Sequence, residues 1–240
     1  MDGSGKMIEL NKIYNESNCD TMRRMPEGCI DLVVTSPPYD DLRTYKGYTW
    51  NFEEVARELY RVLKPGGVVV WVVNDSTVNG SETLTSCKQK IYFRENCGFN
   101  IHDTMIYKKK NPLPIAGNRY NPCFEYTFIL SKGKPTTFNP IMEKKLWIET
   151  RTVKNYSKDK NGVKNYGKVP QTDEKIKDNI FEYKVGGGHV TEDDIAYQHP
   201  AIFPEALARD HILSWSNEGD LVYDPFMGSG TVAKMAILTN

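Results

Sequence analysis

Long apolar runs are absent from this chain, and their absence limits the classes of protein to which it can belong. No stretch of the 240 residues approaches the ~20 apolar residues that a membrane-spanning helix requires. The opening segment "MDGSGKMIEL" also lacks the apolar region of a secretory signal peptide. We therefore expect a cytoplasmic protein without a membrane partner, whose 39% hydrophobic residues suffice for a folded core.

Cysteine is scarce and is not spaced for cross-linking or metal binding. The chain has five cysteines, which are Cys19, Cys29, Cys87, Cys97 and Cys123. Their number is odd, and they lack the closely paired spacing that is typical of zinc sites. We expect buried or free thiols in a reducing compartment rather than disulfides, and we expect no structural metal.

An excess of either charge is also absent, because 31 Lys and Arg balance 31 Asp and Glu. This balance argues against a uniformly basic coat for nucleic acid, but the charges are unevenly distributed. Residues 132–190, here called the basic segment, contain thirteen Lys and Arg against seven Asp and Glu. The segment also contains Phe138, Trp147, Tyr156, Tyr166, Phe181 and Tyr183. Basic residues interleaved with aromatic ones suit phosphate contact and base stacking, although a solvated insertion would explain the composition equally well.

Strand and helix patterns alternate along most of the chain, and no internal repeat is present. This alternation predicts an α/β fold with a mainly parallel sheet and helices on both faces. We expect strands at residues 6–17, 29–36, 68–75, 101–109, 123–133 and 220–226. We expect helices at residues 19–26, 51–64, 81–99, 203–216 and from 231 onward.

The stretch "VVTSPPYDD", Val33 to Asp41, ends one of these strands in an unusual way. Proline lacks the amide hydrogen that a sheet ladder needs and fixes its own φ near −65°, so Pro37 and Pro38 should stop the strand and form a rigid turn. The turn would hold Ser36 and Tyr39 in fixed positions.

The stretch "DPFMGSGT", Asp224 to Thr231, ends another predicted strand with an acid, a Gly-x-Gly turn and the start of a helix. Glycines at such a turn let backbone amides approach a nucleotide-like ligand closely. No lysine follows Gly230, so the loop is not a phosphate-binding P-loop, and a simple tight turn would have the same residues. Open α/β sheets place their ligands at the carboxyl ends of strands, where both stretches lie.

Together these motifs resemble the S-adenosylmethionine-dependent DNA amino-methyltransferases, which act on the N4 amine of cytosine or the N6 amine of adenine. "SPPY" matches the family's catalytic motif, and "DPFMGSG" matches its cofactor loop. "HPAIFPEAL", His199 to Leu207, looks like the segment beside the methionine end of the cofactor. The order of the motifs, with the catalytic motif first, resembles the permuted beta class of these enzymes, some of which belong to restriction-modification systems.

The resemblance implies a Rossmann-like sheet with circularly permuted motif order and three regions. Residues 7–131 would form the catalytic half, residues 132–190 the target-recognition region, and residues 191–240 the cofactor-binding half. The basic segment would then contact double-stranded DNA through phosphates, while other side chains read bases. The cofactor would be S-adenosylmethionine.

The resemblance also assigns roles to individual residues. The catalytic residues would be Ser36, Pro37, Pro38 and Tyr39. The cofactor-binding residues would be Asp224, Pro225, Phe226, Gly228, Ser229, Gly230, Thr231, Phe203 and Pro204, together with Asn18, which lies where the family often has an acid. Weaker candidates are Asn74 and Asp75, for ligand contact or helix capping, and Asn118, Arg119 and Tyr120, for the border of the DNA cleft.

The expected chemistry explains why a rigid turn is useful. An exocyclic amine is a poor nucleophile because its lone pair is delocalised into the base. Hydrogen bonds from the amine to the Ser36 hydroxyl and to a proline carbonyl would localise that lone pair, and Tyr39 would stack on the flipped base. A serine in the first motif position is typical of cytosine N4 methylation, so cytosine is favoured over adenine.

One departure from the resembled pattern leaves alternatives open. The family's fold has a further strand after the helix that follows the glycine loop, and this sequence ends at Asn240 before it. We expect this C-terminal strand to be missing, or to be supplied by another chain, and a homodimer is possible. The alternative function is a methyltransferase remnant that binds DNA without methylating it, and a third is methylation of RNA or a small amine.

Overall fold

The computed structural model describes residues 8–38, 50–112, 114–115, 117–145, 154–168, 173–186, 190–191, 193, 196 and 202–239. Contacts divide the chain into two compact units. The large unit comprises Met1–Asn139 and Asn179–Asn240, and the small unit comprises Pro140–Asp178. Each unit is described separately below.

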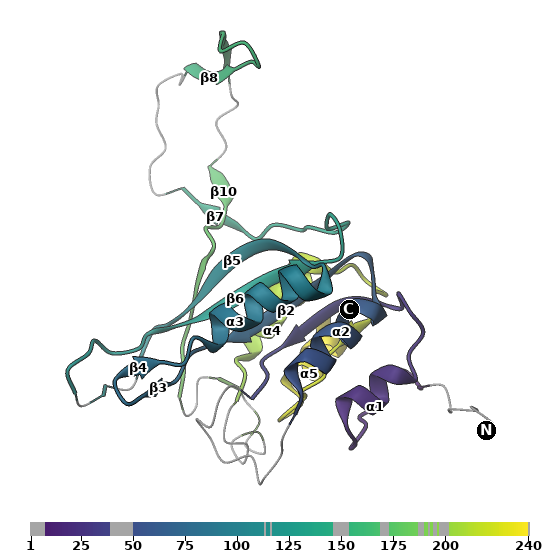
Figure 1. Ribbon diagram of the computed structural model, residues 1–240. Helices are drawn as coiled ribbons and strands as arrows, with labels where there is room; N and C mark the ends of the chain where they lie inside the picture. Colours follow the sequence, from purple (N-terminus) through teal and green to yellow (C-terminus); the bar gives the residue numbers. More distant parts are fainter. Residues whose placement is uncertain are drawn as a thin grey trace. The chain divides into compact units, whose positions relative to one another are not determined.

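The large unit is built on a six-stranded sheet with the strand order β11-β5-β6-β2-β1-β12. Figure 1 labels its neighbouring strands β5, β6 and β2. The strands are β1 (Ile30–Thr35), β2 (Leu63–Val73), β5 (Asn100–Lys109), β6 (Phe124–Ser131), β11 (Ile180–Tyr183) and β12 (Val222–Tyr223). Three of the five pairings are parallel, and β6 runs opposite to its two neighbours, β2 and β5. The expected α/β sheet is confirmed, with one antiparallel strand inserted in it.

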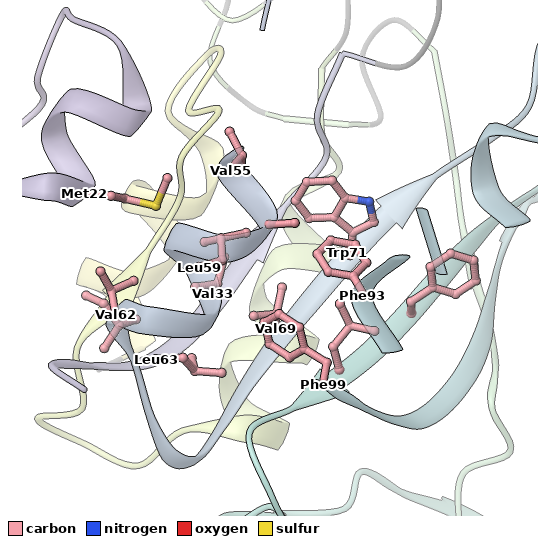
Figure 2. Close-up of a cluster of buried hydrophobic side chains, with 14 of the residues drawn as sticks. Met22, Val33, Val55, Leu59, Val62, Leu63, Val69, Trp71, Phe93 and Phe99 are labelled. Carbon is pink, nitrogen blue, oxygen red and sulfur yellow. The ribbon is translucent and has the colours of Figure 1, made fainter. Parts of the chain in front are cut away.

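Helices cover both faces of this sheet. The helices are α1 (Asn18–Arg23), α2 (Phe52–Val62), α3 (Thr85–Tyr92), α4 (Glu205–Trp215) and α5 (Thr231–Thr239). In Figure 1, α2 and α3 lie on the near face and α4 lies behind the sheet. Val33 and Val69 pack with Leu59 of α2 in one buried cluster (Figure 2), whereas Val34 and Val70 are equally buried but point to the opposite face. The central strands are therefore buried on both sides, as their continuous apolar runs predict.

Helix α2 shows why its sequence folds as it does. The Asn51 side chain accepts hydrogen bonds from the backbone amides of Glu53 and Glu54, at 3.1 and 3.3 Å, and so caps the first turn. The helix buries the residues that recur at helical spacing, namely Val55, Ala56, Leu59 and Val62. The cap fixes the helix start, and it therefore fixes the position of Trp50 immediately before it.

Two expected elements differ in the structure. Within the expected first strand, residues 8–17 form no strand, and the Tyr14 hydroxyl instead bonds the backbone of Glu9. Among the described residues β12 is an edge strand of the sheet, and residues 8–17 do not pair with it.

The helix expected at 81–99 begins at Thr85, because the preceding residues pair in a hairpin of β3 (Thr77–Val78) and β4 (Ser81–Glu82). It continues as a π-helix, η1 (Phe93–Cys97), and ends at Gly98, which adopts a φ of 88°.

The small unit contains two antiparallel pairs of short strands. Strand β7 (Met142–Lys144) pairs with β10 (Glu174–Ile176), and β8 (Lys154–Lys158) pairs with β9 (Lys164–Lys168). The turn between β8 and β9 is stabilised by Asp159, whose carboxylate accepts from the amides of Asn161 and Val163 at 2.9 Å each. Gly162 supplies the positive φ, 80°, that such a turn requires. In the described part of the chain, no helix is both long and apolar enough to cross a membrane.

Candidate active site

A cleft of about 1780 Å³ opens in the large unit at the carboxyl ends of β1, β2, β5, β11 and β12. Its walls come from segments that are far apart in the sequence, including residues 36–38, 203–204 and 224–229. The position is the one that open α/β sheets use for ligands. Both of the turns that stand out in the sequence therefore face the same cleft.

The first turn follows β1. Pro37 is buried, and Ser36 and Pro38 are partly exposed to the cleft. The carbonyl of Pro38 accepts a hydrogen bond from the indole Nε1 of Trp50 at 3.1 Å. No described residue forms a hydrogen bond with the Ser36 hydroxyl, which leaves that group able to bind a ligand. Tyr39 lies outside the described residues.

The second turn follows β12 and leads into α5. Gly228 and Gly230 adopt φ values of 53° and 84°, a region that glycine enters without strain. The Asp224 carboxylate accepts hydrogen bonds from the Phe226 amide at 2.9 Å and from the Thr35 hydroxyl at 2.6 Å. Because Thr35 directly precedes Ser36, the second bond ties the two turns to each other.

The electrostatics of Asp224 reflect this enclosed position. The pKa of its carboxyl group is raised to about 6, mainly because burial disfavours the charged form. The hydrogen bonds from Thr35 and Phe226 act in the opposite direction and reduce this rise. The two hydrogen bonds that the carboxylate accepts hold the loop in shape.

Asn18, the first residue of α1, is also buried beside the second turn. Its side-chain amide donates to the backbone carbonyl of Pro225 at 3.3 Å, and the residue lines the cleft. An amide in place of the expected acid can make this contact because it carries a hydrogen-bond donor. Asn18 thus stabilises the loop, and direct contact with a cofactor stays a prediction.

The cleft contains most of the residues that the sequence motifs single out. Those that line it are Ser36, Pro37, Pro38, Asn18, Phe203, Pro204, Asp224, Pro225, Phe226, Gly228, Ser229 and Thr231. Gly230 does not line the cleft, and its backbone amide donates to the Met227 carbonyl at 2.8 Å. His199, at the start of the third motif, lies outside the described residues.

The weaker candidates lie elsewhere. Asp75 accepts hydrogen bonds from the Ser86 amide at 2.8 Å and from the Ser86 hydroxyl at 2.5 Å, so it caps α3. Asn118, Arg119 and Tyr120 are exposed and do not line the cleft.

Sequence reasoning missed a charged pair in the cleft wall. Lys109, at the end of β5, forms an ion pair of 2.6 Å with Glu125, near the start of β6, and both residues line the cleft beside Tyr107. The Glu125 side chain is only 11% exposed. A lone acid within the apolar strand "FEYTFILS" was the available signal, because a carboxylate is seldom buried without a partner.

Comparisons with known proteins agree with this geometry. Residues 30–240 match the model of a family described as DNA methylase. The chain is 55% identical over 215 residues to Orphan methyltransferase M.BamHII of Bacillus amyloliquefaciens, which covers 88% of this chain and 81% of that protein. It is 28% identical over 242 residues to DNA adenine methyltransferase YhdJ of Escherichia coli strain K12, covering 95% and 75% of the two chains.

Solved structures show the same fold. The PvuII DNA methyltransferase, named as cytosine-N4-specific, aligns with a TM-score of 0.70 at 19% identity, covering 95% of this chain and 78% of that one. A complex of M1.HpyAVI with S-adenosylmethionine aligns with a TM-score of 0.53 at 21% identity, covering 88% and 78%. The match to the family model over most of the chain, and the 55% identity to a named methyltransferase, show that this chain belongs to the S-adenosylmethionine-dependent DNA amino-methyltransferases.

Proposed function

We propose that this chain methylates the N4 amine of cytosine in double-stranded DNA, on a base flipped out of the duplex into the cleft. The observation that carries the proposal is the Thr35–Asp224 hydrogen bond, which joins the Ser36 turn to the glycine loop in one cleft. A methyl donor bound at the glycine loop and an amine bound at the Ser36 turn would then lie next to each other in the cleft.

The residues of the second turn fit S-adenosylmethionine. The positive φ values of Gly228 and Gly230 bring backbone amides to the start of α5, where the helix dipole favours the donor's carboxylate. Phe203 and Phe226 offer apolar surface, and Ser229 and Thr231 offer hydroxyl groups. When bound, the cofactor supplies a sulfonium methyl group that an amine nitrogen can attack.

The residues of the first turn would prepare the amine. The Ser36 hydroxyl would accept one amine hydrogen, which favours a pyramidal nitrogen with a localised lone pair. The Pro38 carbonyl is already bound to Trp50, so the Pro37 carbonyl is the better acceptor for the second hydrogen. Two successive prolines hold these acceptors in place, which matters because about 1.4 kcal/mol of barrier corresponds to a tenfold change in rate. The stacking role of Tyr39 stays a prediction from the sequence.

The choice of cytosine is supported by Ser36 and by the charged pair in the cleft wall. Beside its amine, cytosine presents a ring nitrogen and a carbonyl oxygen, both acceptors, whereas adenine presents a ring nitrogen and a C–H group. The Lys109 ammonium, held by Glu125, is a donor suited to the carbonyl oxygen. Packing alone would discriminate by only about 1 to 3 kcal/mol, so such a donor adds needed selectivity.

DNA contact by the small unit is supported by the register of its longer hairpin. Lys154 pairs with Lys168, Lys158 with Lys164, and Tyr156 with Tyr166. Because alternate residues of a strand share one face, these six residues lie on the same face of the hairpin. Like charges directly opposite each other destabilise a hairpin, so binding of a polyanion that neutralises the lysines should stabilise this one. The phosphates of a DNA duplex are such a polyanion.

Methyl transfer from labelled S-adenosylmethionine to mixed-sequence DNA tests the proposal, with digestion to nucleosides and separation by mass. We expect N4-methylcytosine from the wild-type chain and a rate about 10²-fold lower from Ser36→Ala, because one preorganised acceptor is lost. Ser81→Ala, in the exposed β3–β4 hairpin, is the control and should keep the wild-type rate.

Other outcomes decide between the alternatives. N6-methyladenine as the sole product would contradict the choice of base. DNA binding without any methyl transfer would contradict the proposed activity and favour a remnant that only binds DNA.

A further inference from the structure

Trp50 contacts both turns of the active site without lining the cleft itself. Its indole Nε1 donates to the Pro38 carbonyl at 3.1 Å. Pro38 belongs to the first turn, residues 36–38, here called the catalytic turn. Its ring lies against Phe226 of the glycine loop, with centroids 4.8 Å apart and an interplanar angle of 70°. One side chain therefore joins a polar contact on the first turn to an aromatic contact on the second.

The position of the indole is fixed by groups outside both turns. Trp50 directly precedes Asn51, which caps α2, so its backbone is held at the start of a regular helix. Its ring also packs against Phe52 at 6.1 Å and against Trp71 at 6.3 Å. Trp71 is fully buried and donates to the Gln89 side chain at 2.8 Å. The indole is thus anchored to the core cluster as well as contacting both turns.

The catalytic turn needs such an anchor because of its composition. Pro37 and Pro38 have no amide hydrogens, so they cannot donate the ladder hydrogen bonds that would otherwise tie the turn to the sheet. The described contacts of the turn with other elements include the bond from Trp50 to the Pro38 carbonyl, which restrains the orientation of the peptide unit after Pro38. The adjacent Pro37 carbonyl, the proposed acceptor for the target amine, depends on the same backbone.

We infer that Trp50 is a positioning residue, which sets the distance between the amine acceptors of the catalytic turn and the cofactor loop. This role rests on the proposed methyl transfer. Trp50 does not line the cleft, so loss of its polar contact alone should act on the rate of the chemical step rather than on ligand binding. The polar contact, through the indole N–H, and the ring contact, through Phe226, can be removed separately.

The test compares Trp50→Phe with a matched control, Trp71→Phe. Both variants keep an aromatic ring in the same cluster and remove one indole N–H, but only Trp50 bonds the catalytic turn. We expect Trp50→Phe to lower kcat about 10- to 100-fold, while KM for S-adenosylmethionine and for DNA changes less than about threefold. Trp71→Phe should lower the melting temperature and leave kcat, measured well below that temperature, near the wild-type value.

A third variant, Trp50→Ala, removes the ring contact as well and should also weaken cofactor binding, because Phe226 then keeps only the more distant Trp71 ring, at 6.3 Å, among the indoles that pack against it. The role is overturned if Trp50→Phe keeps the wild-type kcat, or if both phenylalanine variants lose activity in proportion to their loss of stability. An inactive wild-type chain would instead overturn the proposed function and this role with it. An active wild type with an equally active Trp50→Phe would overturn this role alone.

Discussion

The candidate active-site cleft of the large unit and the β8–β9 hairpin of the small unit are assembled in opposite ways. In the cleft, the bond between Thr35 and Asp224 joins residues 189 positions apart, and a core buried on both faces of the sheet holds them together. In the hairpin, Lys158 pairs with Lys164 across a short turn that Asp159 stabilises locally. The proposed methyl transfer in the cleft would therefore depend on exact positions, whereas the proposed DNA contact of the hairpin would depend on charge, which tolerates small displacements. Substitutions in the cleft should abolish single steps, and those in the hairpin should weaken binding gradually.

The largest effect is expected from Gly228→Val in the cleft. Valine at a φ of 53° is strained because its branched Cβ clashes with the backbone, so the glycine loop should lose its shape. We expect calorimetry to detect no S-adenosylmethionine binding, while DNA binding by the small unit is kept.

Gly133→Val is the matched control for this substitution, because Gly133 has a φ of 80° and open space around it but lies away from the cleft. It should lose stability and keep cofactor binding. An equal loss of cofactor affinity in both variants would show that backbone strain in general, rather than the loop, is responsible.

An intermediate and graded effect is expected in the hairpin. Replacing Lys154, Lys158, Lys164 and Lys168 by Gln should lower DNA affinity by roughly 10²-fold near physiological salt, if all four contact phosphates. The plot of log affinity against log salt should become shallower by about 0.9 for each contact removed. Binding titrations at several salt concentrations measure both quantities, and cofactor affinity should stay unchanged.

The opposite face of the same hairpin provides the control. Asn155→Ala with Asn165→Ala should leave the salt dependence as it is, because these residues alternate with the lysines and carry no charge. If the lysine variant has the same salt dependence of DNA affinity as the wild type, DNA phosphates are bound elsewhere on the chain.

The smallest effect is expected from Asp224→Asn on stability. The pKa of Asp224 is raised from 3.8 to about 6 in the folded state, so the folded state binds more protons than the unfolded state between these pH values. The free energy of unfolding should therefore fall as pH rises from about 4 to about 6, and the full penalty should remain above pH 6.

Asparagine keeps an oxygen for Thr35 and Phe226 but carries no charge. Urea unfolding should find Asp224→Asn more stable than wild type at pH 7.5, on the order of 1 kcal/mol, with a smaller difference at pH 4.5. A variant less stable than wild type at pH 7.5 would show that the ionised carboxylate strengthens the loop by more than its burial costs.

The sequence by itself determined the chemistry of the two turns. Pro37 and Pro38 end a strand because proline lacks an amide hydrogen and has a fixed φ. The glycines after Asp224 allow a tight turn before a helix because glycine enters positive φ without strain. Both restrictions act locally on the backbone. The alternation of apolar runs likewise predicted most strands and helices of the large unit. The resemblance to the DNA amino-methyltransferases followed from three short motifs, each made of residues close together in the chain.

Only the tertiary structure decided which distant residues meet. The strand expected at residues 6–17 did not form over the described residues 8–17, because a strand needs a partner and local propensity cannot supply one. The pairing of Lys109 with Glu125 depends on β5 and β6 lying side by side in antiparallel register. The contact of Trp50 with both Pro38 and Phe226 depends on three separate segments, so no spacing in the sequence could reveal it. Local backbone chemistry thus set the shape of each turn, and burial of the sheet's two faces set the distance between the turns.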